Sequence, residues 1–323
     1  MRLPHLSPEA YRRITLVAAV LLALIIVTGG AVRLTDSGLG CPVGLSCPAR
    51  ELHRFAVSSE HRFIEHANRL LTGVVSIAVI VAVLGSLVRV PRRRDLTWLS
   101  VGLVAGVFVQ AVLGQLTVEF DLRPQFVMAH FLVSILLLTD AVWLYRRAGQ
   151  PDGATVSRTI VSRRIVALSR ALVGMAVVVL FTGTVVTGAG PHSGGARHDK
   201  VVRLDLSIPD VARLHGTMVM IFVGLVLVTL WLVWRDRAPR AVRTRLTVLL
   251  VVLVGQAAIG YIQYFNDLPP LLVGFHIAGA TAVWTAVLWF ALGCWERVVP
   301  SPGRERVAAG SGDEPSPSLI GTT

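Results

Sequence analysis

The sequence predicts an all-α integral membrane protein, in which eight transmembrane helices form two pseudo-symmetric four-helix bundles and both termini are cytoplasmic. Three observations predict this fold: few charged residues, eight long apolar runs and an internal repeat. Of the 323 residues, 54% are hydrophobic and only 15% are charged, whereas a soluble domain has roughly 25% charged residues. The runs are also too long and too continuous for barrel strands, which alternate over about 10 residues.

Each apolar run is long enough to be a transmembrane helix, since a helix needs about 20 residues to cross the hydrocarbon core. The runs cover roughly residues 14–34, 66–90, 97–118, 124–145, 165–188, 208–234, 246–265 and 271–295. The first run is longer than the roughly 7–15-residue core of a cleavable signal, and no clear cleavage site follows it. We therefore expect it to remain as the first helix.

Arginine-rich segments set the orientation of these helices, because cytoplasmic loops carry an excess of Arg and Lys. Five such segments alternate strictly with poorer ones, and they begin at Arg2, Arg89, Arg146, Arg235 and Arg297. Both termini and the loops after helices two, four and six are therefore expected in the cytoplasm. The net charge of +12 is spread over five short segments rather than one face, which argues against a nucleic-acid surface.

An internal repeat divides the chain at its longest inner connection, residues 146–164. The stretch "QAVLGQLTVEFDLRPQFVMAH" begins at Gln110 and "QAAIGYIQYFNDLPPLLVGFH" begins at Gln256, so Gln, Gly and His recur at a constant shift of 146 residues. Helix ends "IVTGGAVRLTDSG" and "VVTGAGPHSGG" are also alike. Because each half has four helices, the halves form a parallel repeat about an axis along the membrane normal. The expected division is residues 1–150, residues 151–299, and a disordered cytoplasmic tail, residues 300–323, rich in Ser, Gly and Pro.

Three histidines lie near the outer ends of predicted helices. His130 and His276 are equivalent in the repeat, and His215 on helix six is at the same depth as His276. A lone histidine in a membrane helix is more often a hydrogen-bonded packing residue than a ligand. Two at one depth on alternate helices of a four-helix bundle can supply both axial positions of a heme iron. No Cys-x-x-Cys-His motif occurs, so such a heme would not be covalently attached.

Helix two begins with a polar group, Glu65, His66, Asn68 and Arg69. At 100° per residue, Glu65, Asn68 and Arg69 share one face, while His66 points about 160–200° away from Asn68. One interpretation is an interfacial polar cap with an ion pair between Glu65 and Arg69, which contributes a few tenths of a kcal/mol. The other is a site, because a carboxylate within a bundle is costly unless it faces a cavity or a partner.

The remaining polar and sulfur groups have simpler interpretations. Outside the cytoplasm, Cys41 and Cys47 are expected to form a disulfide, either structural or redox-active; a zinc site would lack two ligands. Cys294 is expected to be a small buried hydrophobe. Asp140 is expected to pair with Arg146 or Arg147. Helix packing is the role expected for Gln110, Gln256, Gly114 and Gly260.

Together these features resemble the heme A synthase family, which oxidises a methyl group of heme O to the formyl group of heme A. The resemblance spans about residues 14–297, in eight helices and two halves. Its marks are Thr28-Gly29-Gly30, "TDSGLGC" with Cys41 and Cys47, Glu65, His130, His215 and His276. It implies a multi-pass protein of the bacterial plasma membrane that serves cytochrome oxidase assembly, with its active site toward the outer face.

The resemblance also assigns roles. Glu65 matches the glutamate implicated in catalysis, and His215 and His276 match the pair that ligates the iron of a resident heme b in the C-terminal half. His130 matches one of two histidines in the N-terminal half, where the substrate heme O is thought to bind. Heme O synthase is the expected partner, and the sequence does not identify the electron donor.

One departure from the family bears on the substrate site. The usual motif on helix two is Glu-x-x-His-Arg, but here Asn68 stands at the histidine position. The expected heme O site therefore consists of His130, Asn68 and Arg69, with His66 as the weaker candidate. Iron held by His130 alone keeps an open coordination position, which oxygen activation requires.

Two other functions are compatible with the same residues. A diheme b-type cytochrome of the membrane would use the histidines for electron transfer and make no new product. A transporter is suggested by the repeat and the intramembrane polar groups, and it would contain no heme.

Overall fold

The computed structural model describes residues 5–38, 59–153, 155–192, 194 and 202–299, with only the backbone described for 59–62. Its elements are α1 (Pro8–Leu34), α2 (Ser59–Val88), α3 (Arg94–Glu119), α4 (Pro124–Ala148), β1 (Val156–Thr159), α5 (Arg163–Ala189), α6 (Ile208–Arg235), α7 (Arg240–Phe265), α8 (Pro270–Gly293) and β2 (Trp295–Val298). All eight helices in this part of the chain are long and apolar enough to cross a membrane. The predicted all-α integral membrane fold is confirmed.

Most helices begin earlier than the apolar runs do, because their first turns are polar. The hydroxyl of Ser7 accepts a hydrogen bond from the backbone N–H of Ala10, and Pro8 follows as the first helical residue, so α1 begins well before the predicted residue 14. This is the usual arrangement at a helix N-terminus. Likewise α2 begins at Ser59 rather than 66. As a result, the polar group around Glu65 lies about two turns inside the helix instead of at its first turn.

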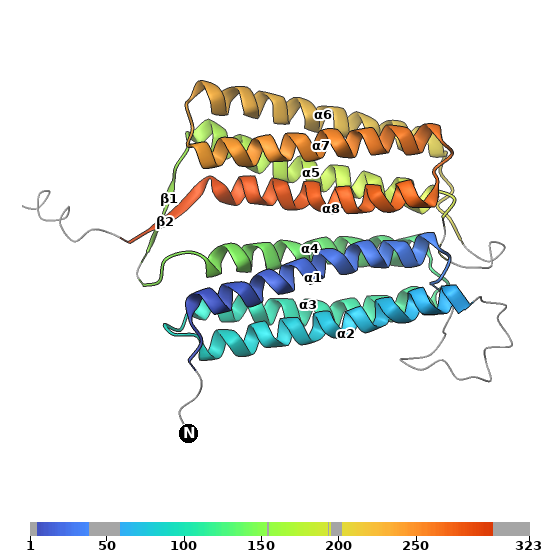
Figure 1. Cartoon of the computed structure of the whole chain (residues 1–323). Helices are drawn as coiled ribbons and strands as arrows, with labels where there is room; N and C mark the ends of the chain where they lie inside the picture. Colours follow the sequence, from blue (N-terminus) through green and yellow to red (C-terminus); the bar gives the residue numbers. More distant parts are fainter. Residues whose placement is uncertain (1–4, 39–58, 154, 193, 195–201, 300–323) are drawn as a thin grey trace, which may run out of the picture.

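The helices form two closed rings of four. In the first ring, α1 and α3 each contact both α2 and α4; in the second, α5 and α7 each contact both α6 and α8. The rings meet where α1 contacts α8 and where α4 contacts α5 and α8. Figure 1 shows the two bundles side by side, with α2 and α6 far from the boundary. This arrangement is the one expected for a parallel repeat.

The repeat extends to the turns that join α3 to α4 and α7 to α8. Asp121 and Leu122 have φ values of 50° and 57°, and Asp267 and Leu268 have 57° and 58°. A non-glycine residue in this left-handed region costs about 1 kcal/mol. In both turns the leucine N–H closes the helix end, onto Thr117 O at 2.8 Å and onto Gln263 O at 2.9 Å.

A short sheet, which the sequence did not predict, joins the ends of the two halves. β1 lies in the connection between the bundles and pairs antiparallel with β2, from Val156↔Val298 to Thr159↔Trp295. Helix α8 therefore ends before the predicted residue 295, and Cys294 caps it. Cys294 is fully buried, as expected; burial raises the pKa of its thiol to about 11.

The predicted ion pair between Asp140 and Arg146 or Arg147 is wrong. Arg147 forms its ion pair with Asp95, and Arg146 donates to the carbonyl of Trp295 at 3.1 Å. Asp140 lies nearly two turns before these arginines and faces α3, where a Cβ on Gly102 would be 2.9 Å from its Oδ2. Glycine is therefore the residue that lets this carboxyl group approach the neighbouring helix.

Candidate functional site

Two imidazole rings face each other inside the C-terminal bundle. His215 is in the second turn of α6 and His276 in the second turn of α8, and both helices begin at the same end of the molecule. Their ring centroids are 6.5 Å apart, with ring planes at 71°. Two imidazoles that bind one metal from opposite sides lie about 6 Å apart, since each metal–nitrogen bond is about 2 Å long. The separation therefore suits a metal held between them.

Glycines on the neighbouring helices let both rings sit this close to the backbone. A Cβ at Gly183 on α5 would lie 3.2 Å from Cε1 of His215, and one at Gly260 on α7 would lie 3.0 Å from Cε1 of His276. Both distances are shorter than ordinary van der Waals contact. A larger residue at either glycine would push the ring out of place.

The hydrogen bonds of His215 fix its protonation. The Thr182 hydroxyl lies 3.0 Å from His215 Nδ1 and 3.0 Å from each of the carbonyl oxygens of Val178 and Val179. A hydroxyl has one hydrogen, and within a helix it is donated to a carbonyl one turn back. Thr182 therefore accepts from Nδ1–H of His215, which leaves Nε2 unprotonated and able to bind a metal.

The N-terminal bundle contains the same construction around His130. Gln110 donates from Nε2 to the carbonyl of His130 at 3.0 Å, just as Gln256 donates to the carbonyl of His276 at 2.9 Å. A Cβ at Gly114 would lie 3.6 Å from Cε1 of His130. The expected packing roles of the paired glutamines and glycines are thus confirmed. In the described part of the chain, Nδ1 of neither histidine has a hydrogen-bond partner, although both atoms are buried.

Asn68 occupies the place in the N-terminal bundle that His215 occupies in the other. The hydroxyl of Thr28 donates to Oδ1 of Asn68 at 2.8 Å, so Asn68 contacts a threonine on the first helix of its half as His215 contacts Thr182, with the direction of the hydrogen bond reversed. The repeat therefore aligns Thr28-Gly29 with Thr182-Gly183, not with the Thr-Gly pair five residues later that the helix ends suggested. Two imidazoles face each other in the C-terminal half; by the repeat, the position that corresponds to His215 in the N-terminal half carries the carboxamide of Asn68.

Glu65 and Arg69 lie on the same helix as Asn68. The carboxylate of Glu65 accepts from Nη2 of Arg69 at 2.5 Å, and the Glu65 side chain is only 6% exposed. His66 is exposed, as its helical phase predicts. The ion pair expected in the polar-cap interpretation is present, but its acid is buried within the bundle. Cys41 and Cys47 lie outside the described residues.

Comparisons with known proteins all find proteins of one kind. A family model described as cytochrome oxidase assembly protein matches residues 51–192. The heme A synthase of Listeria monocytogenes serovar 1/2a is 26% identical over 304 residues, which is 89% of this chain and 94% of that protein. The heme A synthase of Listeria innocua is 25% identical with the same coverage. The heme A synthase of Bacillus pumilus is 28% identical over 136 residues, covering 42% of this chain and 44% of that protein.

The chain is similar to heme A synthases over 89% of its length. The resemblance inferred from the order of the polar residues is thereby confirmed. Within the eight helices that the structure describes, the contact between Thr28 and Asn68 marks a point where the two halves of the chain differ.

Sequence reasoning missed three residues of the site region. The sequence does not single out Thr182 and Gly183, because "FTGT" lies inside an apolar run, although it repeats the Thr-Gly of the first helix. Arg33 was overlooked because single outer arginines are common. Its Nε donates to His192 O and its Nη2 to Thr187 O, both at 2.9 Å. It thereby joins the end of α1 in one half to the end of α5 in the other.

We expect Arg33→Gln to lower the thermal stability of the purified protein by more than a surface change does. A hydrogen bond from a charged donor contributes about 1.5–3 kcal/mol, and this side chain makes two across the boundary. Arg203→Gln is the matched control, because its exposed guanidinium also donates to a backbone carbonyl, that of Pro191. Equal melting temperatures for the two variants in detergent would contradict this role.

Proposed function

We propose that this chain is a heme A synthase that oxidises a methyl group of heme O to the formyl group of heme A. The conversion adds one oxygen and removes two hydrogens, so the methyl carbon is oxidised first to the alcohol and then to the aldehyde. One observation carries the proposal: a buried glutamate lies on the same helix as Asn68, in a half whose second ligand position has lost its imidazole. Relatives that align with 89% of this chain are named heme A synthase.

In this proposal the C-terminal half, residues 151–299, holds heme b through the iron ligands His215 and His276. The residues fit the group: the rings are 6.5 Å apart, Thr182 leaves Nε2 of His215 free, and glycines make room for both rings. When bound, heme b supplies one-electron transfer, because an iron with two imidazoles has no position for oxygen.

The N-terminal half, residues 1–150, takes the substrate heme O. His130 binds its iron from one side, and Asn68 faces it from the position of the missing histidine. A carboxamide is a weaker iron ligand than an imidazole, so this half is suited to keeping one coordination position open. Arg69 holds Glu65 in place and carries positive charge beside the site.

Glu65 is the catalytic residue of this proposal. Its carboxylate is buried and oriented by Arg69, so it is held in place before the substrate arrives. A fixed carboxylate in a site of low polarity stabilises positive charge that develops at the oxidised methyl carbon, and it accepts a proton released there. Both actions require an ionised oxygen close to the methyl group.

Several further features complete the proposal. The arginine distribution supports cytoplasmic termini and a site toward the outer face of the bacterial plasma membrane. A Cys41–Cys47 disulfide closes the first outer loop, where an oxidising compartment favours it. Heme O is delivered by a partner, heme O synthase, and a separate electron donor serves heme b.

We expect Thr182→Val to weaken retention of heme b, because removing the hydroxyl frees the orientation and tautomer of His215. Loss of such a supporting hydrogen bond typically costs 10–100-fold in metal affinity. Thr184→Val is the matched control, since Thr184 is buried on the same helix but donates only to Phe181 O. The measurement is heme loss to apomyoglobin, followed in the Soret band. Equal rates for both variants would exclude this role for Thr182.

The function is tested in cells that make heme O but no heme A. The full chain is expressed there, and the extracted hemes are identified by mass and by pyridine hemochrome spectra. We expect heme A, which cells with the empty vector lack. Heme b bound to the protein together with unchanged heme O would instead indicate a diheme cytochrome, and protein without a Soret band would indicate a transporter.

A further inference from the structure

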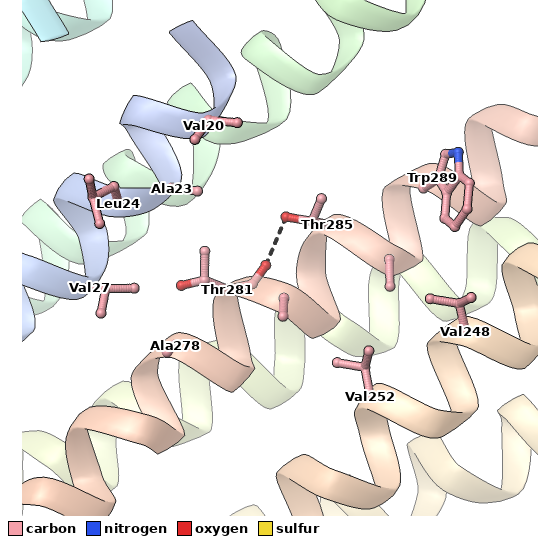
Figure 2. A pocket seen from close by; sticks show the side chains of 12 residues that line it. Val20, Ala23, Leu24, Val27, Val248, Val252, Ala278, Thr281, Thr285 and Trp289 are labelled. Atoms are coloured by element: carbon pink, nitrogen blue, oxygen red, sulfur yellow. Dashed lines mark hydrogen bonds between the residues drawn. The ribbon is translucent and has the colours of Figure 1, made fainter. Parts of the chain in front are cut away.

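An apolar groove of about 510 Å³ runs along the boundary between the two bundles. It is lined by α1 of one half and by α7 and α8 of the other, including Val20, Leu24, Val27, Val252, Ala282 and Trp289. Figure 2 shows α1 on one side of this space and α8 and α7 on the other. Val20, Leu24 and Trp289 are about half exposed, so the groove opens to the outer surface of the bundles.

Three arginines gather at one end of this groove, where α1 and α7 begin and α8 ends. Arg245 lies one helical turn before the groove residue Val248, and its guanidinium is 5.7 Å from the ring centroid of Trp289. Arg146 on α4 is close enough to Arg245 and to Arg12 on α1 for their charges to repel one another.

These arginines lack the neutralisation that other arginines of the protein have. Arg89, Arg93 and Arg147 form ion pairs with Asp152 or Asp95, but in the part of the chain that the structure describes none of the three at the groove does. Arg146 donates to Trp295 O and Arg12 to the hydroxyl of Tyr145, both at 3.1 Å, and both acceptors are neutral. Glu296 is the acidic residue whose charge acts on Arg146. The cluster therefore keeps an excess of positive charge.

We propose that an anionic phospholipid binds here, with its phosphate at Arg245, Arg146 and Arg12 and an acyl chain in the groove. Basic groups between transmembrane helices on the cytoplasmic side bind anionic headgroups, and guanidinium groups donate paired hydrogen bonds to phosphate. An acyl chain fits a groove whose lining is almost entirely apolar and open to the bilayer. Trp289 marks the depth at which headgroup and chain meet. Because α1 and α7 belong to different halves, this lipid stabilises the boundary between them.

Quenching of Trp289 fluorescence by brominated lipids tests the proposal. The purified full chain is titrated in mixed micelles with dibrominated phosphatidylglycerol or dibrominated phosphatidylcholine, and Trp289→Phe protein gives the contribution of the other tryptophans. We expect the fraction of phosphatidylglycerol that quenches half of the Trp289 fluorescence to be lower than the corresponding fraction of phosphatidylcholine. The expected difference is roughly fivefold for each arginine that contacts the phosphate.

Two variants and one control test whether the lipid preference arises from the arginines and the groove. Arg245→Gln is expected to reduce the preference for phosphatidylglycerol about fivefold, whereas Arg92→Gln, an exposed arginine at the α2–α3 turn, leaves it unchanged. Ala282→Phe fills the groove at an exposed position and is expected to reduce Trp289 quenching by both lipids, with an unchanged elution volume. Equal quenching by the two lipids in the wild type would overturn the proposal. An unchanged preference for phosphatidylglycerol in Arg245→Gln would also overturn it. Relief of Trp289 quenching by added heme O would overturn it as well, because the groove would then bind the isoprenoid tail of the substrate.

Discussion

Glu65→Gln is expected to lower the rate of heme A formation about 100-fold or more while the protein keeps its resident heme. The substitution retains the size of the side chain and an acceptor for Arg69, but it removes the negative charge and the group that takes up a proton. Loss of a general base or of a charge-stabilising group typically costs 10²–10⁴-fold. The measurement is heme A produced per heme b, with heme O supplied in excess.

A neighbour on the same helix provides the control for Glu65. His66 is adjacent in sequence but exposed on the other face of α2, so His66→Gln is expected to retain the wild-type rate. A wild-type rate in Glu65→Gln would remove the carboxylate from the mechanism. A strong loss in His66→Gln would show that the exposed face of α2, not the face with Asn68, meets the substrate.

Removing His276 is expected to abolish binding of heme b. Its ring faces His215 at 6.5 Å and is held by Gly260 and by the contact of Gln256 with its carbonyl. Without it the iron keeps one protein ligand, so we expect the Soret absorbance per protein of His276→Gly to fall to about a tenth or less. Heme A formation should fall with it, because electrons no longer reach the substrate half.

Added imidazole shows whether His276→Gly loses heme because it lacks an iron ligand or because it misfolds. His276→Gly leaves a space of the shape of the lost ring, and millimolar imidazole is expected to restore the Soret band. His192→Ala is the control, because this histidine contacts the carbonyl of Leu268 in the α7–α8 turn at 2.7 Å and pairs with no second imidazole among the described residues. Full heme content in His276→Gly without imidazole would exclude it as a ligand.

The sequence predicted the membrane spans and the repeat because both depend on signals that tertiary structure does not alter. Crossing the bilayer requires long apolar runs, and Gln110 and Gln256 recur at one spacing because each bonds the same carbonyl on the next helix. Helical phase alone was also enough to place His66 on a different face from Glu65, and the exposure of His66 and burial of Glu65 agree with this.

Contacts between elements far apart in the sequence were not predictable in this way. The pairing of β1 with β2 joins segments more than 100 residues apart, and neither segment has a strong strand pattern. Thr182 was missed because a threonine within an apolar run has many possible partners, and only the fold brings it to His215. The same applies to Asp140, whose position against Gly102 depends on how α3 and α4 pack.

The difference between the two halves is the main consequence of the structure for function. The contacts of Thr28 with Asn68 and of Thr182 with His215 lie at corresponding positions of the two halves, yet only one of them orients an imidazole. We infer that one half has kept two ligands for electron transfer, while the other has given up one and gained a place for chemistry.

Oxidation of heme O by this chain can be measured with purified protein that contains heme b and is supplied with heme O, a reductant and oxygen. The extracted hemes are then identified by mass. We expect heme O to be converted to a product with one more oxygen and two fewer hydrogens, which is heme A, while heme b is retained. Full recovery of unchanged heme O from protein whose heme b is present and reducible would contradict the proposed function.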